Sequence, residues 1–76
     1  MEKIDININT EYIKLDQLLK FSAVAGSGAD AKDMILSGMV SLNGEVCLMR
    51  GKKVREGDTV KVEFQDETVE ITVGHE

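Results

Sequence analysis

The sequence contains one cysteine and one histidine, and it has neither proline nor tryptophan. Cys47 has no second cysteine with which to form an internal disulfide, and His75 is the penultimate residue, so a disulfide scaffold and a zinc site are both excluded. A lone thiol is typical of a reducing compartment. The chain also lacks the roughly 20 consecutive apolar residues of a membrane-spanning helix and the apolar run of a signal peptide. We therefore expect a cytoplasmic protein that holds no metal ion or cofactor.

Residues suited to catalysis are also scarce. No serine lies in a nucleophile motif, and His75 is too near the end of the chain to be held in a defined geometry. Asp30 and Asp33 could share one face of a helix, but such pairs are usually solvated capping charges. Residues 26–28 (Gly-Ser-Gly) precede a predicted helix, yet the Gly-Lys-Ser/Thr of a phosphate-binding loop does not follow them. The sequence predicts a non-enzymatic protein.

The remaining composition suits one small soluble domain that spans residues 1–76 and carries its charge unevenly. Hydrophobic residues make up 42% of the chain and charged residues 30%, which is typical of a folded protein. The net charge is −5. Residues 45–61 nevertheless carry an excess of two positive charges, whereas residues 62–76 carry five acidic residues and no lysine or arginine. A local patch can therefore attract an anion despite the net charge.

The first half of the chain predicts one strand followed by two helices. Apolar and polar residues alternate over 3–9, which indicates a half-buried strand. Apolar residues then recur at helical spacing over 15–25, and Gly26 is expected to end this helix in a left-handed conformation. Ser27 is expected to cap a second helix that runs to about residue 37.

After Gly38 the apolar residues recur with a period of two. Four strands are predicted, at 39–42, 45–48, 59–64 and 69–73. Asn43-Gly44 predicts a tight hairpin turn between the first two, and residues 49–58 are expected to form a loop. Two consecutive helices cannot supply crossovers between parallel strands, so we predict an α+β fold with two short helices packed on a small, mainly antiparallel sheet. Phe21 and Phe64 are both expected to pack in the core.

The predicted loop holds a cluster of four cations within six positions: Arg50, Lys52, Lys53 and Arg55. Arginine offers a fork to phosphate oxygens and lysine a mobile point charge, so the cluster could bind phosphates. A solvated loop is the alternative, because charged runs are common on protein surfaces and aromatic stacking platforms are absent from the sequence pattern.

Four segments occur together at characteristic spacings. They are Leu15-Asp16-Gln17-Leu18-Leu19-Lys20, then Ser27 with Ala31-Lys32 and Ile35-Leu36, then Gly38-Met39-Val40-Ser41-Leu42-Asn43-Gly44, and then Gly57-Asp58-Thr59-Val60. Over about residues 11–64 this combination resembles the S4 domain, an RNA-binding domain named after ribosomal small-subunit protein four, and above all its small stand-alone bacterial members. The resemblance implies that the two helices and the hairpin form an αL motif, which grips structured RNA by its phosphates and its shape.

The resemblance also implies a set of RNA-binding residues: Lys14, Lys20, Lys32, Arg50, Lys52, Lys53 and Arg55. Ser27 and Asn43 are further candidate contacts, although a helix cap and a hairpin turn explain them without RNA. Each cation could instead be a solvated charge, and Lys32 could pair with a neighbouring acid. Asp33 stands where many family members carry another cation, which weakens this face of the second helix.

The sequence thus predicts non-enzymatic binding of structured RNA, ribosomal or transfer RNA, by a ribosome-associated protein. The alternative is a protein-interaction adapter on the same fold with little RNA affinity, which would dock through its acidic C-terminal strands or an unpaired sheet edge. The arrangement of charges separates the two interpretations. Convergence of the cations on one face favours RNA, whereas interleaving with acids favours the adapter; these acids are Asp16, Asp30, Asp33 and Glu56.

Overall fold

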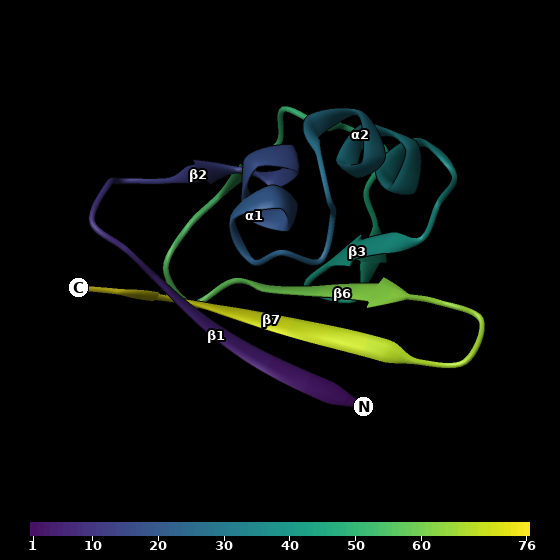
Figure 1. Cartoon of the computed structure of the whole chain (residues 1–76). Coiled ribbons are helices and arrows are strands. Elements are labelled where there is room, and N and C mark those ends of the chain that lie inside the picture. The colour runs from purple at the N-terminus through teal and green to yellow at the C-terminus, as the bar shows by residue number, and fades with distance from the viewer.

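The alternating residues at the start of the chain form the edge strand β1 (Glu2–Ile8). In the computed structural model, which describes residues 1–76, β1 lies parallel to the last strand, β7 (Thr68–His75). The other neighbours in the sheet are antiparallel and comprise β6 (Thr59–Glu63), β3 (Val40–Leu42) and β4 (Glu45–Val46). The sheet has the order β1-β7-β6-β3-β4, with both helices on one side of it (Figure 1). The predicted α+β fold with a mainly antiparallel sheet is confirmed.

A second, two-stranded sheet joins segments that the sequence does not predict to pair. β2 (Ile13–Lys14) runs antiparallel to β5 (Lys53–Val54), which lies inside the predicted loop 49–58. Two residues are too few for a recognisable alternation, so neither strand can be identified from its own residues. Their pairing brings the start of the first helix against the basic loop.

The first helix, α1 (Leu15–Phe21), is shorter than predicted. The expectation that it continues through residue 25 and ends at a left-handed Gly26 is wrong. Ala23 takes the left-handed conformation instead, with φ at 64°. The N–H of Ala25 then donates to the carbonyl of Leu19 at 3.0 Å, and Ala25 turns back into the core, where it is 2% exposed. Ala23 thus adopts a backbone conformation that is unfavourable for alanine, and the turn that it forms buries Ala25.

The second helix, α2 (Gly28–Leu36), and the hairpin after it follow the prediction closely. The Ser27 hydroxyl accepts a hydrogen bond from the N–H of Asp30 at 3.1 Å, which satisfies a free donor of the first turn. Asn43 and Gly44 both have positive φ and form the turn between β3 and β4. Neither helix of the chain is long and apolar enough to span a membrane.

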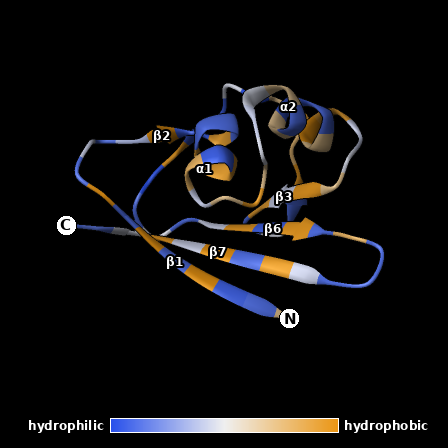
Figure 2. Ribbon diagram, viewed as in Figure 1, coloured by the Kyte–Doolittle hydropathy of each residue, from blue (hydrophilic) through white to orange (hydrophobic).

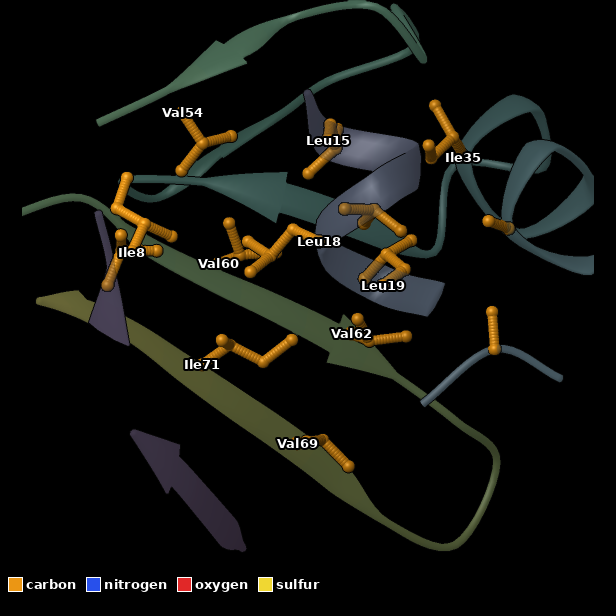
Figure 3. Close-up of a cluster of buried hydrophobic side chains, with 14 residues drawn as sticks. Ile8, Leu15, Leu18, Leu19, Ile35, Val54, Val60, Val62, Val69 and Ile71 are labelled. Carbon is orange, nitrogen blue, oxygen red and sulfur yellow. The ribbon is translucent and has the colours of Figure 1, made fainter. Parts of the chain in front are cut away.

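The core lies between α1 and the larger sheet, as Figure 3 shows. Three leucines of α1 are fully buried against strand residues that include Val60 and Ile71; they are Leu15, Leu18 and Leu19. Apolar and polar residues alternate along β1, β6 and β7 (Figure 2), so the face of the sheet away from the helices is polar. One sheet face and the leucine stripe of α1 therefore supply most of the core, which Ala25, Val54 and the α2 residues Ala31 and Ile35 complete.

The two phenylalanines differ in how far their side chains are buried. Phe64 is partly buried and packs against the core, as predicted. The same prediction for Phe21 is wrong, because its side chain is 65% exposed. Phe21 follows the buried Leu19 by two residues, and residues two apart on a helix point to nearly opposite sides.

Candidate nucleic-acid interface

The β2–β5 pair places two lysines directly opposite each other. Lys14 is the register partner of Lys53. On the helix side of this pair, the N–H of Leu15 donates to the carbonyl of Lys52 at 2.9 Å, and the N–H of Asp16 donates to the carbonyl of Arg50 at 3.0 Å. These bonds hold the basic segment against the start of α1.

The alternation of side chains gives the two-stranded sheet one apolar and one charged face. Ile13 pairs with Val54, and Val54 is fully buried in the core. Because paired residues of an antiparallel sheet project to the same side and successive residues to opposite sides, Lys14 and Lys53 project to the outer face. If the register is continued by one residue, Tyr12 lies opposite Arg55, and both project to that outer face as well.

Two cation–π contacts agree with this placement. The Nζ atom of Lys53 lies 4.9 Å from the centroid of the Tyr12 ring, and the guanidinium carbon of Arg55 lies 5.9 Å from it. Both distances are within the range of favourable cation–π contacts. Tyr12 is not among the site residues predicted from the sequence, and the expectation that no aromatic group accompanies the cations is wrong. Two triplets of the sequence could have indicated this strand pair: Tyr12-Ile13-Lys14 and Lys53-Val54-Arg55. In each triplet an apolar residue stands between two polar ones, as in a short strand with one buried face.

We define the basic patch as the cations that the β2–β5 pair and the adjoining loop bring together: Lys14, Arg50, Lys52, Lys53 and Arg55. No carboxylate oxygen lies within 4.0 Å of a charged side-chain nitrogen of these cations, and the two ion pairs of the molecule lie elsewhere. One joins the N-terminal amine to Glu67 and the other joins Lys61 to Glu70. Like charges directly opposite each other destabilise a strand pair. A bound anion would therefore reduce the repulsion between Lys14 and Lys53.

The other two predicted cations lie apart from the basic patch. Lys20 occupies the last turn of α1, about 9 Å along the helix axis from Lys14. Lys32 lies on α2, between Ala31 and Asp33. No hydrogen bond, ion pair or strand pairing joins either lysine to the patch, and Lys32 forms no ion pair with a neighbouring acid. The structure thus brings together five of the seven predicted cations.

Acidic residues border the basic patch, and one of them is held by structural hydrogen bonds. The carboxylate of Asp58 accepts from the N–H of Arg55 at 2.8 Å and from the amide of Asn43 at 3.1 Å. Asp16 accepts from the N–H of Gln17 at 2.8 Å, and Glu56 is exposed beside Arg55. The strongly acidic turn between β6 and β7 lies at the opposite end of the molecule from β2 (Figure 1). The two-stranded sheet of the basic patch and the acidic β6–β7 turn therefore lie at opposite ends of the molecule.

The two further candidate contacts have structural roles. Asn43 uses both ends of its side-chain amide, since its oxygen accepts from the N–H of Thr59 at 2.9 Å while its nitrogen donates to Asp58. Ser27 caps α2 through its hydroxyl. The turn and the cap therefore account for both residues.

Two open hollows flank the basic patch. One is lined by Tyr12, Lys14 and Gln17 together with Thr10, Glu11 and Ile13. The other runs from the β3–β4 hairpin to Lys52 and Arg55, and it contains three apolar side chains that are more than half exposed: Val46, Leu48 and Met49. The molecule has no cluster of three or more histidine, cysteine or acidic residues that could hold a metal ion. Besides cationic, aromatic and apolar groups, the two hollows expose carboxylates: Glu11 in the first and Glu45, Glu56 and Asp58 in the second.

Comparison with known proteins finds a family, a curated relative and solved structures that are similar to this chain. The family described as "S4 domain" matches residues 6–72. The probable ribosome maturation protein RlbA of Bacillus subtilis (strain 168) is 41% identical over 58 residues, which cover 76% of this chain and 82% of that protein. The solution structure of YbcJ from E. coli is similar with a TM-score of 0.59 and 29% identity, over 95% of this chain and 87% of that one. YbcJ is described as having an αL motif involved in RNA binding.

Proposed function

The chain belongs to the S4 domain family, and from this membership we propose that it binds structured RNA, chiefly ribosomal RNA, through the basic patch. The observation that carries the proposal is the pairing of Lys14 with Lys53 on the outer face of β2 and β5, with no carboxylate oxygen within 4.0 Å of either ammonium group. Arg50, Lys52 and Arg55 extend the positive charge around this pair. Phosphate oxygens are the complementary ligand for such a cluster.

The shape of folded RNA suits a patch of this kind. An A-form helix hides its base edges in a deep and narrow major groove, so proteins recognise it mainly through phosphates, 2′-hydroxyls and overall shape. The patch rests on backbone hydrogen bonds between α1 and the basic segment, and on Val54 buried beneath it. Its cations are therefore anchored at the backbone, and Lys53 and Arg55 also lie against the Tyr12 ring. None of them forms an ion pair, which suits contact with phosphates in a fixed spatial arrangement.

Lys20 and Lys32 are secondary contacts in this proposal. Both are exposed and unpaired, but only RNA that extends beyond the patch along the helices would reach them. Asp33 next to Lys32 weakens the local attraction for phosphate. For Asn43 and Ser27 we propose structural roles, because an RNA contact would compete with the hydrogen bonds that they already make.

Ribosomal RNA is the preferred ligand because two similarities support it together. The relative from Bacillus subtilis is named as a probable ribosome maturation protein, and YbcJ is described as having an RNA-binding motif. Transfer RNA is the other structured RNA to which S4-type binding would extend.

A direct test measures equilibrium binding of the full chain to three probes at low salt: a hairpin from ribosomal RNA, a transfer RNA, and the DNA duplex with the sequence of the hairpin stem. We expect the ribosomal hairpin to bind most tightly and the DNA duplex least tightly, because only RNA offers A-form shape and 2′-hydroxyls. Equal binding to the RNA and DNA stems would reduce the function to non-specific attraction for phosphate. A preference for transfer RNA would redirect the proposal to that substrate.

The alternative function is a protein-interaction adapter, and it rests on the open edge of β1 and on the exposed residues Val46, Leu48 and Met49. β1 carries Lys3 and Asp5, and such charges usually protect an edge strand from pairing. The adapter is therefore the weaker candidate. Failure of the wild-type protein to bind any of the three probes at low salt would favour it.

A further inference from the structure

Tyr12 is the only tyrosine of the chain, and it lies where the basic patch meets a hollow. Its ring is half-buried, and cations of the patch lie 4.9 and 5.9 Å from its centroid. We propose that Tyr12 stacks with one unpaired nucleobase while the patch holds the adjoining phosphates. The inference rests on the proposed function and deepens it, since it makes a bulge, a loop or a strand end the preferred part of the RNA.

The position of the ring supports this role. Tyr12 and Lys14 are two residues apart in extended chain, so both project to the outer face beside Lys53 and Arg55. The hydroxyl of Thr10 donates to the Tyr12 carbonyl at 2.8 Å and so fixes the backbone at this point. An aromatic side chain set among cations is the combination that proteins use to bind unpaired nucleotides, where bases stack and phosphates are neutralised.

The hollow beside the ring adds a group that can recognise the edge of a base. Gln17 lines this hollow together with Tyr12, and its exposed side-chain amide makes no hydrogen bond within the protein. An amide has both a donor and an acceptor, so it can pair with the edge of a base held against the ring. Lys14, which also lines the hollow, is placed to contact the phosphate of the same nucleotide.

A purely structural role for Tyr12 makes a different prediction. If the ring only positions Lys53 and Arg55, its loss should weaken binding to paired and unpaired RNA equally. If the ring stacks on a base, its loss should affect only RNA with an unpaired base. Tyr12→Leu removes the aromatic ring, and Tyr12→Phe keeps it and serves as the matched control.

The experiment compares two hairpins that differ at one position, where a 2-aminopurine is either bulged or paired. We expect wild type and Tyr12→Phe to bind the bulged hairpin more tightly than the paired one by roughly 5- to 150-fold, the range of a single base–aromatic stack. Tyr12→Leu should lose this preference and still bind the paired hairpin within about twofold of wild type. The bulged 2-aminopurine should also be quenched on binding to wild type and not on binding to Tyr12→Leu.

Circular dichroism of each variant would establish that it is folded. Equal weakening of both hairpins by Tyr12→Leu, or an unchanged preference for the bulge, would overturn the stacking role while leaving the patch as an RNA-binding surface. If wild type binds neither hairpin, the proposed function fails and this inference fails with it.

Discussion

Helix α2 and the β2–β5 pair both present lysines to solvent, but the charges around those lysines differ. On α2, Lys32 is the only cation and shares the helix with Asp30 and Asp33. On the β2–β5 pair, Lys14 faces Lys53, so one cation lies directly opposite another. None of these three lysines forms an ion pair, so the difference lies in the charges of the neighbouring residues. The comparison teaches that neighbouring charges, rather than the number of lysines, determine which surface can attract an anion in a chain with a net charge of −5.

The two regions also differ in what the fold requires of their charges. Lys32 on α2 can be solvated at no cost. The like charges of Lys14 and Lys53, paired directly opposite each other, repel in the free protein, and a bound phosphate would offset this repulsion. A surface that is slightly unfavourable for stability and favourable for binding is typical of functional sites.

The largest effect should come from charge reversal within the patch. We expect Lys52→Glu/Lys53→Glu/Arg55→Glu to weaken binding to structured RNA by roughly 100-fold or more, because three charge-assisted contacts become repulsive. The matched control, Lys3→Glu/Lys20→Glu/Lys32→Glu, changes the net charge equally but leaves the patch intact. It should weaken binding by less than about tenfold, since only diffuse attraction and secondary contacts are lost. Fluorescence anisotropy at low salt measures both, and equal losses would remove the distinction between patch and helices.

Lys14→Glu should separate binding from stability. An opposite-charge pair with Lys53 and a negative charge at the start of α1 both favour the fold, so we expect the free energy of unfolding to rise by about 0.5–1 kcal/mol. RNA binding should fall by roughly tenfold because one phosphate contact is lost. Urea denaturation and anisotropy of the same preparation give the two numbers. A variant that is both less stable and weaker in binding would show that Lys14 has a structural role.

The smallest effect should come from α2. We expect Lys32→Gln to weaken binding by no more than about threefold, against roughly tenfold for Lys53→Gln, because Lys32 has no neighbouring cation to reinforce it. Both substitutions remove a single charge, so the ratio of their effects is independent of net charge. A greater loss of affinity for Lys32→Gln than for Lys53→Gln would show that the principal RNA contact lies on α2.

The sequence predicts the elements whose signals are local. Ser27 and Asp30 mark the start of α2 within four residues, and Asn43-Gly44 marks the hairpin within two. The end of α1 depends on burial of Ala25 instead, which is a tertiary effect, and Phe21 is exposed because only the leucine stripe faces the sheet.

The interface is less predictable because residues about 40 positions apart create it. Neither β2 nor β5 can be recognised in the sequence without knowing that the two pair. The cations beside the Tyr12 ring are Lys53 and Arg55, which this pairing brings to it. Family resemblance supplies the seven cations as a set. It cannot divide them into the five that converge and the two that do not, because that division depends on the strand register and the position of α1.

Contacts between a local patch and RNA phosphates release counterions, so the dependence of affinity on salt tests the proposed interface most directly. With four to six phosphate contacts, the logarithm of the wild-type association constant should fall against the logarithm of salt concentration with a slope of about −3 to −5. Lys52→Gln/Lys53→Gln should make this slope shallower by about 2, whereas Lys3→Gln/Lys61→Gln, which has the same net charge, should leave it unchanged. Equal slopes for the two double variants, or a wild-type affinity that salt does not change, would contradict the proposed interface.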